Sequence, residues 1–215
     1  MSLRAASAVI VLVIGRIASA DPSNSTLVYV GLAMAPPTYV AGVSIHEGSH
    51  AIAAKIVGAD VEELHLFPPG IDPHVHKFRF GWTYVRGLRS RGDHAFFYIA
   101  PKITDTILLG GFTAVLFAAW PHNRYGQLAL TVGATGLWVD FAKDVVLFSD
   151  TNDVSQYERV TCMRGWRRAV NRIGYGLLAA GLAAPVAVGY YRTFERSSTS
   201  AAATPILLPL VTTSF

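Results

Sequence analysis

The chain has 215 residues, of which 52% are hydrophobic and only 15% are charged, and its mean hydropathy is +0.37. This composition is too apolar for an ordinary soluble domain of this length and is typical of a multi-pass membrane protein. The net charge of +4 would suit nucleic-acid binding, but lysine and arginine also accumulate in the cytoplasmic loops of membrane proteins.

The first twenty residues have the pattern of a secretory signal sequence. Arg4 provides a basic start, AASAVIVLVIG is a short apolar stretch, and Ala18-Ser19-Ala20 resembles a cleavage site. An uncleaved anchor helix is the alternative, although this apolar run is short against the ~20 residues that cross a bilayer. We therefore expect residues 1–20 to be a signal sequence or anchor helix, 21–194 a single membrane-embedded domain, and 195–215 a tail.

Four further apolar stretches are each near or above the length that crosses a bilayer. They lie at about 27–58, 95–119, 125–148 and 173–191. The first contains Pro36-Pro37, which predicts a break or kink that leaves 38–58 as a separate helix. In 59–94, alternating apolar and polar residues flank a Pro/Gly turn, which predicts a small β-hairpin. The expected fold is an all-α polytopic membrane protein with about four transmembrane helices and this hairpin.

Basic residues are concentrated in two loops of the expected fold. Residues 59–94 and 149–172 are rich in lysine and arginine, whereas the loop around PHNRYG has only Arg124. The positive-inside rule therefore places the N-terminus and both basic loops in the cytoplasm. Because this topology accounts for the positive charge, we expect no nucleic-acid partner.

The stretch SIHEGSH, at 44–50, places three ionisable side chains inside an apolar run. On a helix His46 and His50 lie on one face, where two imidazole nitrogens can bind one metal ion, and Glu47 adjoins them. In this H-E-x-x-H pattern the glutamate is a general base in zinc hydrolases. Ionisable residues inside apolar spans are usually functional, which favours a metal site over a coincidental buried polar cluster.

A catalytic zinc site typically has three protein ligands, so another segment must supply the third. The single cysteine, Cys162, excludes a thiolate cluster, so a histidine or carboxylate is needed. The expected topology points to four aspartates near the cytoplasmic ends of other spans: Asp140, Asp144, Asp150 and Asp153. The first two are equally consistent with an internal ion-pair set and the last two with solvated turn residues, so spacing leaves the choice open.

Three segments together resemble the site-2 protease family of intramembrane zinc metalloproteases. They are HEGSHAIAAKIVG at 46–58, Ala100-Pro101, and SDTNDV at 149–154, and the resemblance covers roughly 38–160. In that family a later helix supplies an aspartate as the third zinc ligand, which favours Asp153 although Val154 replaces the usual glycine. The resemblance thus implies Zn²⁺ bound by His46, His50 and Asp153, with Glu47 as the catalytic base; Asp150 stays an alternative.

The resemblance also implies an activity and a location. We expect a zinc endopeptidase that hydrolyses peptide bonds in or near transmembrane segments of other membrane proteins, so its partners are these substrates and the lipid bilayer. The expected location is a bacterial inner (plasma) membrane, with the active site toward the cytoplasm. The alternative is a non-proteolytic, degenerate membrane protein that uses the cluster to bind a metal or a partner. Glu47 favours hydrolysis, because metal binding alone needs no adjacent base.

Overall fold

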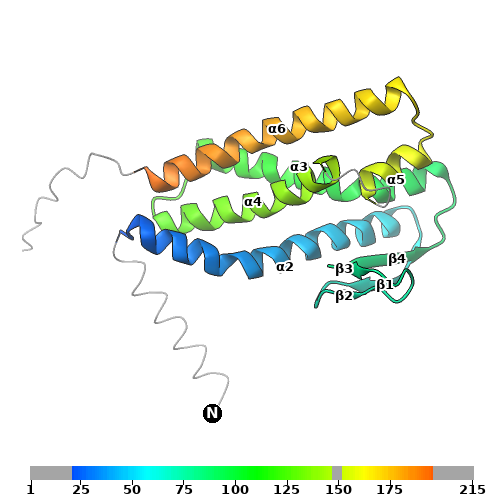
Figure 1. Cartoon of the computed structure of the whole chain (residues 1–215), viewed down its shortest axis with the longest axis horizontal. Helices are drawn as coiled ribbons and strands as arrows, with labels where there is room; N and C mark the ends of the chain where they lie inside the picture. Colours follow the sequence, from blue (N-terminus) through cyan, green and yellow to red (C-terminus); the bar gives the residue numbers. More distant parts are fainter. Residues whose placement is uncertain (1–20, 147–151, 196–215) are drawn as a thin grey trace, which may run out of the picture.

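The computed structural model describes residues 21–146 and 152–195, so the expected signal or anchor segment, Asp150 and nearly all of the tail lie outside the described residues. Four long helices run alternately up and down in one bundle (Figure 1): α2 (Asn24–Ile56), α3 (Arg91–Ala118), α4 (Arg124–Val146) and α6 (Trp166–Phe194). The short helix α5 (Asp153–Val160) precedes α6. The β region and α5 lie at the same end of the bundle, so the described parts of both basic loops are there.

Three of the described helices, α2, α3 and α6, are long and apolar enough to cross a membrane. The protein is therefore mostly helical and suited to membrane association, as the sequence predicts. The fourth expected span corresponds to α4, which packs in the same bundle but does not reach the hydropathy of the other three. Its last turns carry Asp140, Lys143 and Asp144, which reduce its apolar character.

The prediction that 38–58 is a separate helix after Pro36-Pro37 is wrong, because α2 continues through both prolines as one helix of 33 residues. Packing against α4 holds the helix on both sides of the pair. Before the prolines, Gly31 lies against Leu128 of α4, and after them Thr38 lies against Gly136, where an added Cβ would be only 2.7 Å from the threonine methyl. Neighbouring helices commonly support prolines in membrane helices in this way.

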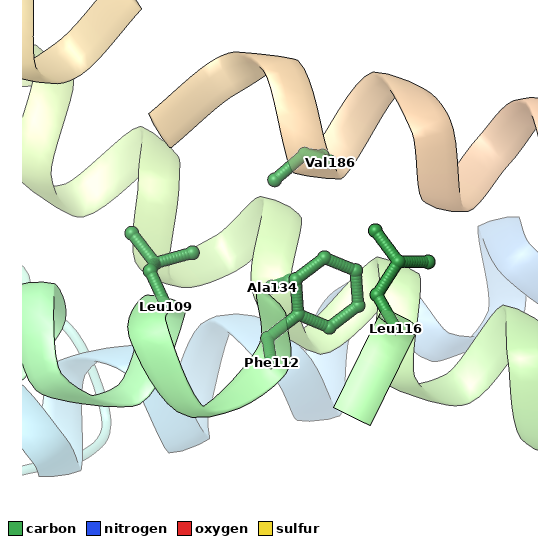
Figure 2. Close-up of a cluster of buried hydrophobic side chains, with 5 residues drawn as sticks. All are labelled: Leu109, Phe112, Leu116, Ala134 and Val186. Carbon is green, nitrogen blue, oxygen red and sulfur yellow. The ribbon is translucent and has the colours of Figure 1, made fainter. Parts of the chain in front are cut away.

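The bundle core lies between α3, α4 and α6. Three side chains of α3 at helical spacing face α4 and α6, and each residue of this core is less than 8% exposed. Figure 2 shows the set: Leu109, Phe112, Leu116, Ala134 and Val186. Replacing a buried aromatic of this kind with alanine typically lowers the free energy of unfolding by about 3–5 kcal/mol. These contacts therefore contribute strongly to the packing of α3 against α4.

The predicted hairpin is present and packs beside the C-terminal half of α2 (Figure 1). Strand β1 (Asp60–His65) pairs antiparallel with β4 (Trp82–Arg86). Between them, β2 (Gly70–Ile71) pairs antiparallel with β3 (Phe78–Arg79). Because of this pairing, β4 lies beside α2, the helix that contains the H-E-x-x-H motif.

Asp72 anchors the inner turn of the hairpin. Its fully buried carboxylate accepts hydrogen bonds from the Tyr84 hydroxyl, at 2.6 and 2.8 Å, and from the backbone N–H groups of His74 and Val75. Burial alone would raise the pKa of Asp72, but these hydrogen bonds outweigh it and hold the pKa below its usual value. Burial and the bond to Asp72 raise the pKa of Tyr84 to about 12, so both groups keep their pairing through the neutral range.

Candidate metal centre and active site

Helix α2 and helix α5 bring three side chains together at the hairpin end of the bundle. The Oδ2 atom of Asp153 lies 3.0 Å from Nε2 of His46 and 3.2 Å from Nε2 of His50. One ligand atom from each residue lies within 4.8 Å of the other two, so the group could hold a metal ion. All three side chains are at most 15% exposed.

The hydrogen bonds behind the two imidazoles show why a cation fits between them and Asp153. His50 Nδ1 lies 2.8 Å from the Phe97 carbonyl oxygen, which only accepts, so this nitrogen carries the proton. His46 Nδ1 lies 2.8 Å from Oδ2 of Asp140 and has the same role. In a neutral imidazole the Nε2 atom then has no proton, and its lone pair faces the Asp153 carboxylate. Such a contact is repulsive unless a metal ion or an added proton lies between the atoms.

The donor set and its spacing fit zinc. Two imidazole nitrogens and one carboxylate are a typical set for a catalytic zinc, which keeps one position open. Bonds of about 2.0–2.1 Å in a tetrahedron place neighbouring ligand atoms ~3.3 Å apart, and the contacts of 3.0 and 3.2 Å to Asp153 are close to that spacing. The acceptors behind His46 and His50 are the outer partners that orient ligand histidines.

Asp140 and Asp144, two of the four aspartates predicted as candidates, lie behind this centre with Lys102 of α3. The Lys102 Nζ atom lies 2.9 Å from Asp144, 3.3 Å from Asp140 and 3.6 Å from Asp105, and its side chain is 1% exposed. It also donates to the Asp140 backbone carbonyl at 2.7 Å. Lys102 therefore fixes Asp140 from behind while Asp140 holds His46. Asp150 lies outside the described residues.

Replacing Lys102 with methionine is expected to destabilise the protein by about 3–5 kcal/mol, because it leaves buried carboxylates without their cation. Unfolding of the variant in detergent would measure the loss. The control is Lys143→Met, because Lys143 also contacts Asp140, at 2.5 Å, but its side chain is 42% exposed. Solvent screening limits such a pair to about 0–1 kcal/mol. Equal stability losses in the two variants would contradict the role given to Lys102.

Glu47 lies in the same cavity as the two histidines and Asp153. This cavity has a volume of about 440 Å³ and is partly closed by residues of β4. Thr83 of β4 donates a hydrogen bond of 2.8 Å to Oε2 of Glu47 and is 3.1 Å from its backbone oxygen. The hairpin thus orients the glutamate that adjoins the metal centre.

Gly81 allows β4 to approach α2 this closely. A Cβ at this position would lie 2.7 Å from Val43 Cγ1, 2.9 Å from Glu47 Cγ and 2.9 Å from the backbone oxygen of His65. We expect Gly81→Ala to cost about 1–3 kcal/mol through overpacking and to move Thr83 away from Glu47. Unfolding and any hydrolytic rate would both be measured. Gly70→Ala is the control, because its nearest contacts would be 3.9 and 4.0 Å; equal effects of both changes would refute this role.

Three parts of the site were missed by sequence reasoning. The Phe97 contact is made by a backbone carbonyl, which any residue has, so the sequence does not mark it. Thr83 contacts Glu47 because β4 pairs with β1, and this pairing is a tertiary feature. Asn152 did carry a signal, because asparagine commonly precedes the first turn of a helix. Its side chain accepts from the Ser155 N–H at 2.8 Å and donates to the Asp144 carbonyl at 3.0 Å. It thereby places Asp153 at the start of α5.

No protein-family model, curated protein or solved structure matches this chain. Its function is therefore inferred from the residues and contacts described above.

Proposed function

We propose that the protein is a membrane-embedded zinc endopeptidase that hydrolyses peptide bonds in or near the transmembrane segments of other proteins. The observation that carries this proposal is the convergence of His46, His50 and Asp153 on one point, with Glu47 in the same cavity. The three converging groups suffice for a metal site. Glu47 adds the base that hydrolysis requires, and the resemblance to the site-2 protease family points to the same roles.

Each side chain has a definite task in this proposal. His46, His50 and Asp153 hold Zn²⁺, and their outer partners keep the two Nε2 atoms directed at it. A bound zinc ion supplies Lewis-acid polarisation of a substrate carbonyl and makes water more acidic. Glu47 accepts a proton from the attacking water and passes it to the leaving amine. At ~30 Å³ per water, the cavity of about 440 Å³ has room for several waters beside a peptide segment.

The surface around the site supports a substrate in the membrane. The hairpin exposes apolar side chains, each more than half exposed: Phe67, Ile71, Phe78 and Phe80. Ile52 and Ile56, on the last turns of α2 beyond His50, are also more than half exposed. Soluble proteins seldom expose so many large apolar side chains together, whereas a bilayer covers them at no cost. A peptide bond brought to this centre would therefore come from a membrane-embedded or membrane-proximal segment.

The test uses the purified full chain in neutral detergent, with zinc measured per chain. Single-span membrane segments in the same micelles serve as substrates, and mass spectrometry locates new termini. We expect cleavage that a zinc chelator stops and added zinc restores. Stoichiometric zinc without cleavage of any segment would contradict hydrolysis and leave the metal-binding alternative.

A further inference from the structure

A second polar cavity lies outside the metal centre, where α5 is joined to α6. Its volume is about 230 Å³, and three arginines line it: Arg159, Arg164 and Arg168. Glu158 is the one acidic residue of its lining. The cavity therefore has an excess of positive charge.

The negative charge of Glu158 is compensated by Arg168 and Arg172, so it does not cancel the charge of the other arginines in the cavity. Its carboxylate, 2% exposed, accepts from Arg168 Nε at 2.7 Å and from Arg172 Nη2 at 2.9 Å, and Asn171 donates at 3.1 Å. Burial alone would raise the pKa of Glu158, but the hydrogen bonds from Arg172, Asn171 and Arg168 outweigh it, so the group stays ionised. Within the described residues Arg164 makes no hydrogen bond or ion pair, and it is exposed.

The outer face of α6 next to this cavity is apolar. Four side chains at helical spacing are each more than half exposed: Trp166, Val170, Ile173 and Leu177. They begin level with the cavity and continue along a helix that is long and apolar enough to cross a bilayer. Tryptophan is enriched at the depth of lipid headgroups. With α6 across a bilayer, Arg164 and Arg168, on either side of Trp166 in the sequence, would be at headgroup depth.

We propose that this cavity binds the phosphate of an anionic membrane phospholipid. Guanidinium groups match the geometry of phosphate oxygens and form charge-assisted hydrogen bonds with them. Basic pockets beside membrane helices commonly bind lipid headgroups. The proposal depends on membrane insertion of α6 but is independent of hydrolysis at the zinc centre.

The experiment titrates phosphatidylglycerol into the full-length protein in neutral detergent and counts bound lipid by native mass spectrometry. Phosphatidylcholine, which has the phosphate but no net charge, is the reference lipid, and we expect it to bind more weakly. Arg164→Ala should weaken phosphatidylglycerol binding about tenfold, the factor for one charge-assisted hydrogen bond. Arg167→Ala is the matched control, because Arg167 is an exposed neighbour that does not line the cavity; it should leave binding unchanged.

Three results would overturn this assignment. Equal binding of the two lipids would remove the requirement for an anionic headgroup. Equal losses in Arg164→Ala and Arg167→Ala would show diffuse attraction to a basic surface rather than a site. Inorganic phosphate that displaces the lipid at comparable concentration would identify a free-phosphate site. Zinc content, which we expect to be unchanged in both variants, reports that the fold and metal centre are intact.

Discussion

Replacing Glu47 with glutamine is expected to slow hydrolysis by orders of magnitude while zinc stays bound. Glutamine keeps the size of the side chain and its contact with Thr83, but it cannot accept a proton from water. Loss of a general base typically lowers the rate by about 10²- to 10⁴-fold. The measurement is kcat on a cleaved membrane segment, together with zinc per chain by elemental analysis.

Two controls make this result specific to Glu47. Glu62→Gln changes an exposed glutamate of β1 whose one partner among the described residues is the exposed Arg86, and it should leave the rate unchanged. Thr83→Val removes the hydrogen bond that orients Glu47 and should give a smaller loss than Glu47→Gln. If Glu47→Gln retains both full zinc and full cleavage, the protease proposal fails.

Replacing Asp153 with alanine is expected to remove zinc from the purified protein, because only two histidine ligands would remain. Replacing Asp140 with asparagine should have a smaller effect. Asp140 contacts Nδ1 of His46, on the side of the ring away from Asp153. Loss of such an outer partner typically lowers metal affinity by about 10- to 100-fold. Competition with a chelating dye would measure both affinities, so the order of the two losses separates a ligand from an orienting residue.

Asp144→Asn is the control for these changes, since Asp144 contacts Lys102 rather than a histidine and should retain zinc. Asp150→Ala should be measured separately, because Asp150 lies outside the described residues. Full zinc in Asp153→Ala would assign the third ligand to another residue and reject the site proposed here.

The parts of the structure that follow from local rules could be predicted from the sequence. Helical spacing brings His46 and His50 onto one face, and the alternation around the Pro/Gly turn predicts the hairpin. Features set by tertiary contacts could not. Proline geometry predicts a break in α2, but packing against α4 overrides it. Spacing left four aspartates open as the third ligand; the family resemblance favoured Asp153, and the path of α5 brings it to the histidines.

The separation of these side chains along the chain has a consequence for biosynthesis. His50 and Asp153 are 103 positions apart, and Asp153 reaches the centre only after α3, α4 and the start of α5 have been made. A growing chain with α2 in the bilayer thus has both histidines and the base but lacks the third ligand. Under the proposed function, the enzyme is inert toward surrounding membrane proteins until the bundle has closed. Closure of the bundle would then be the step that completes the catalytic centre.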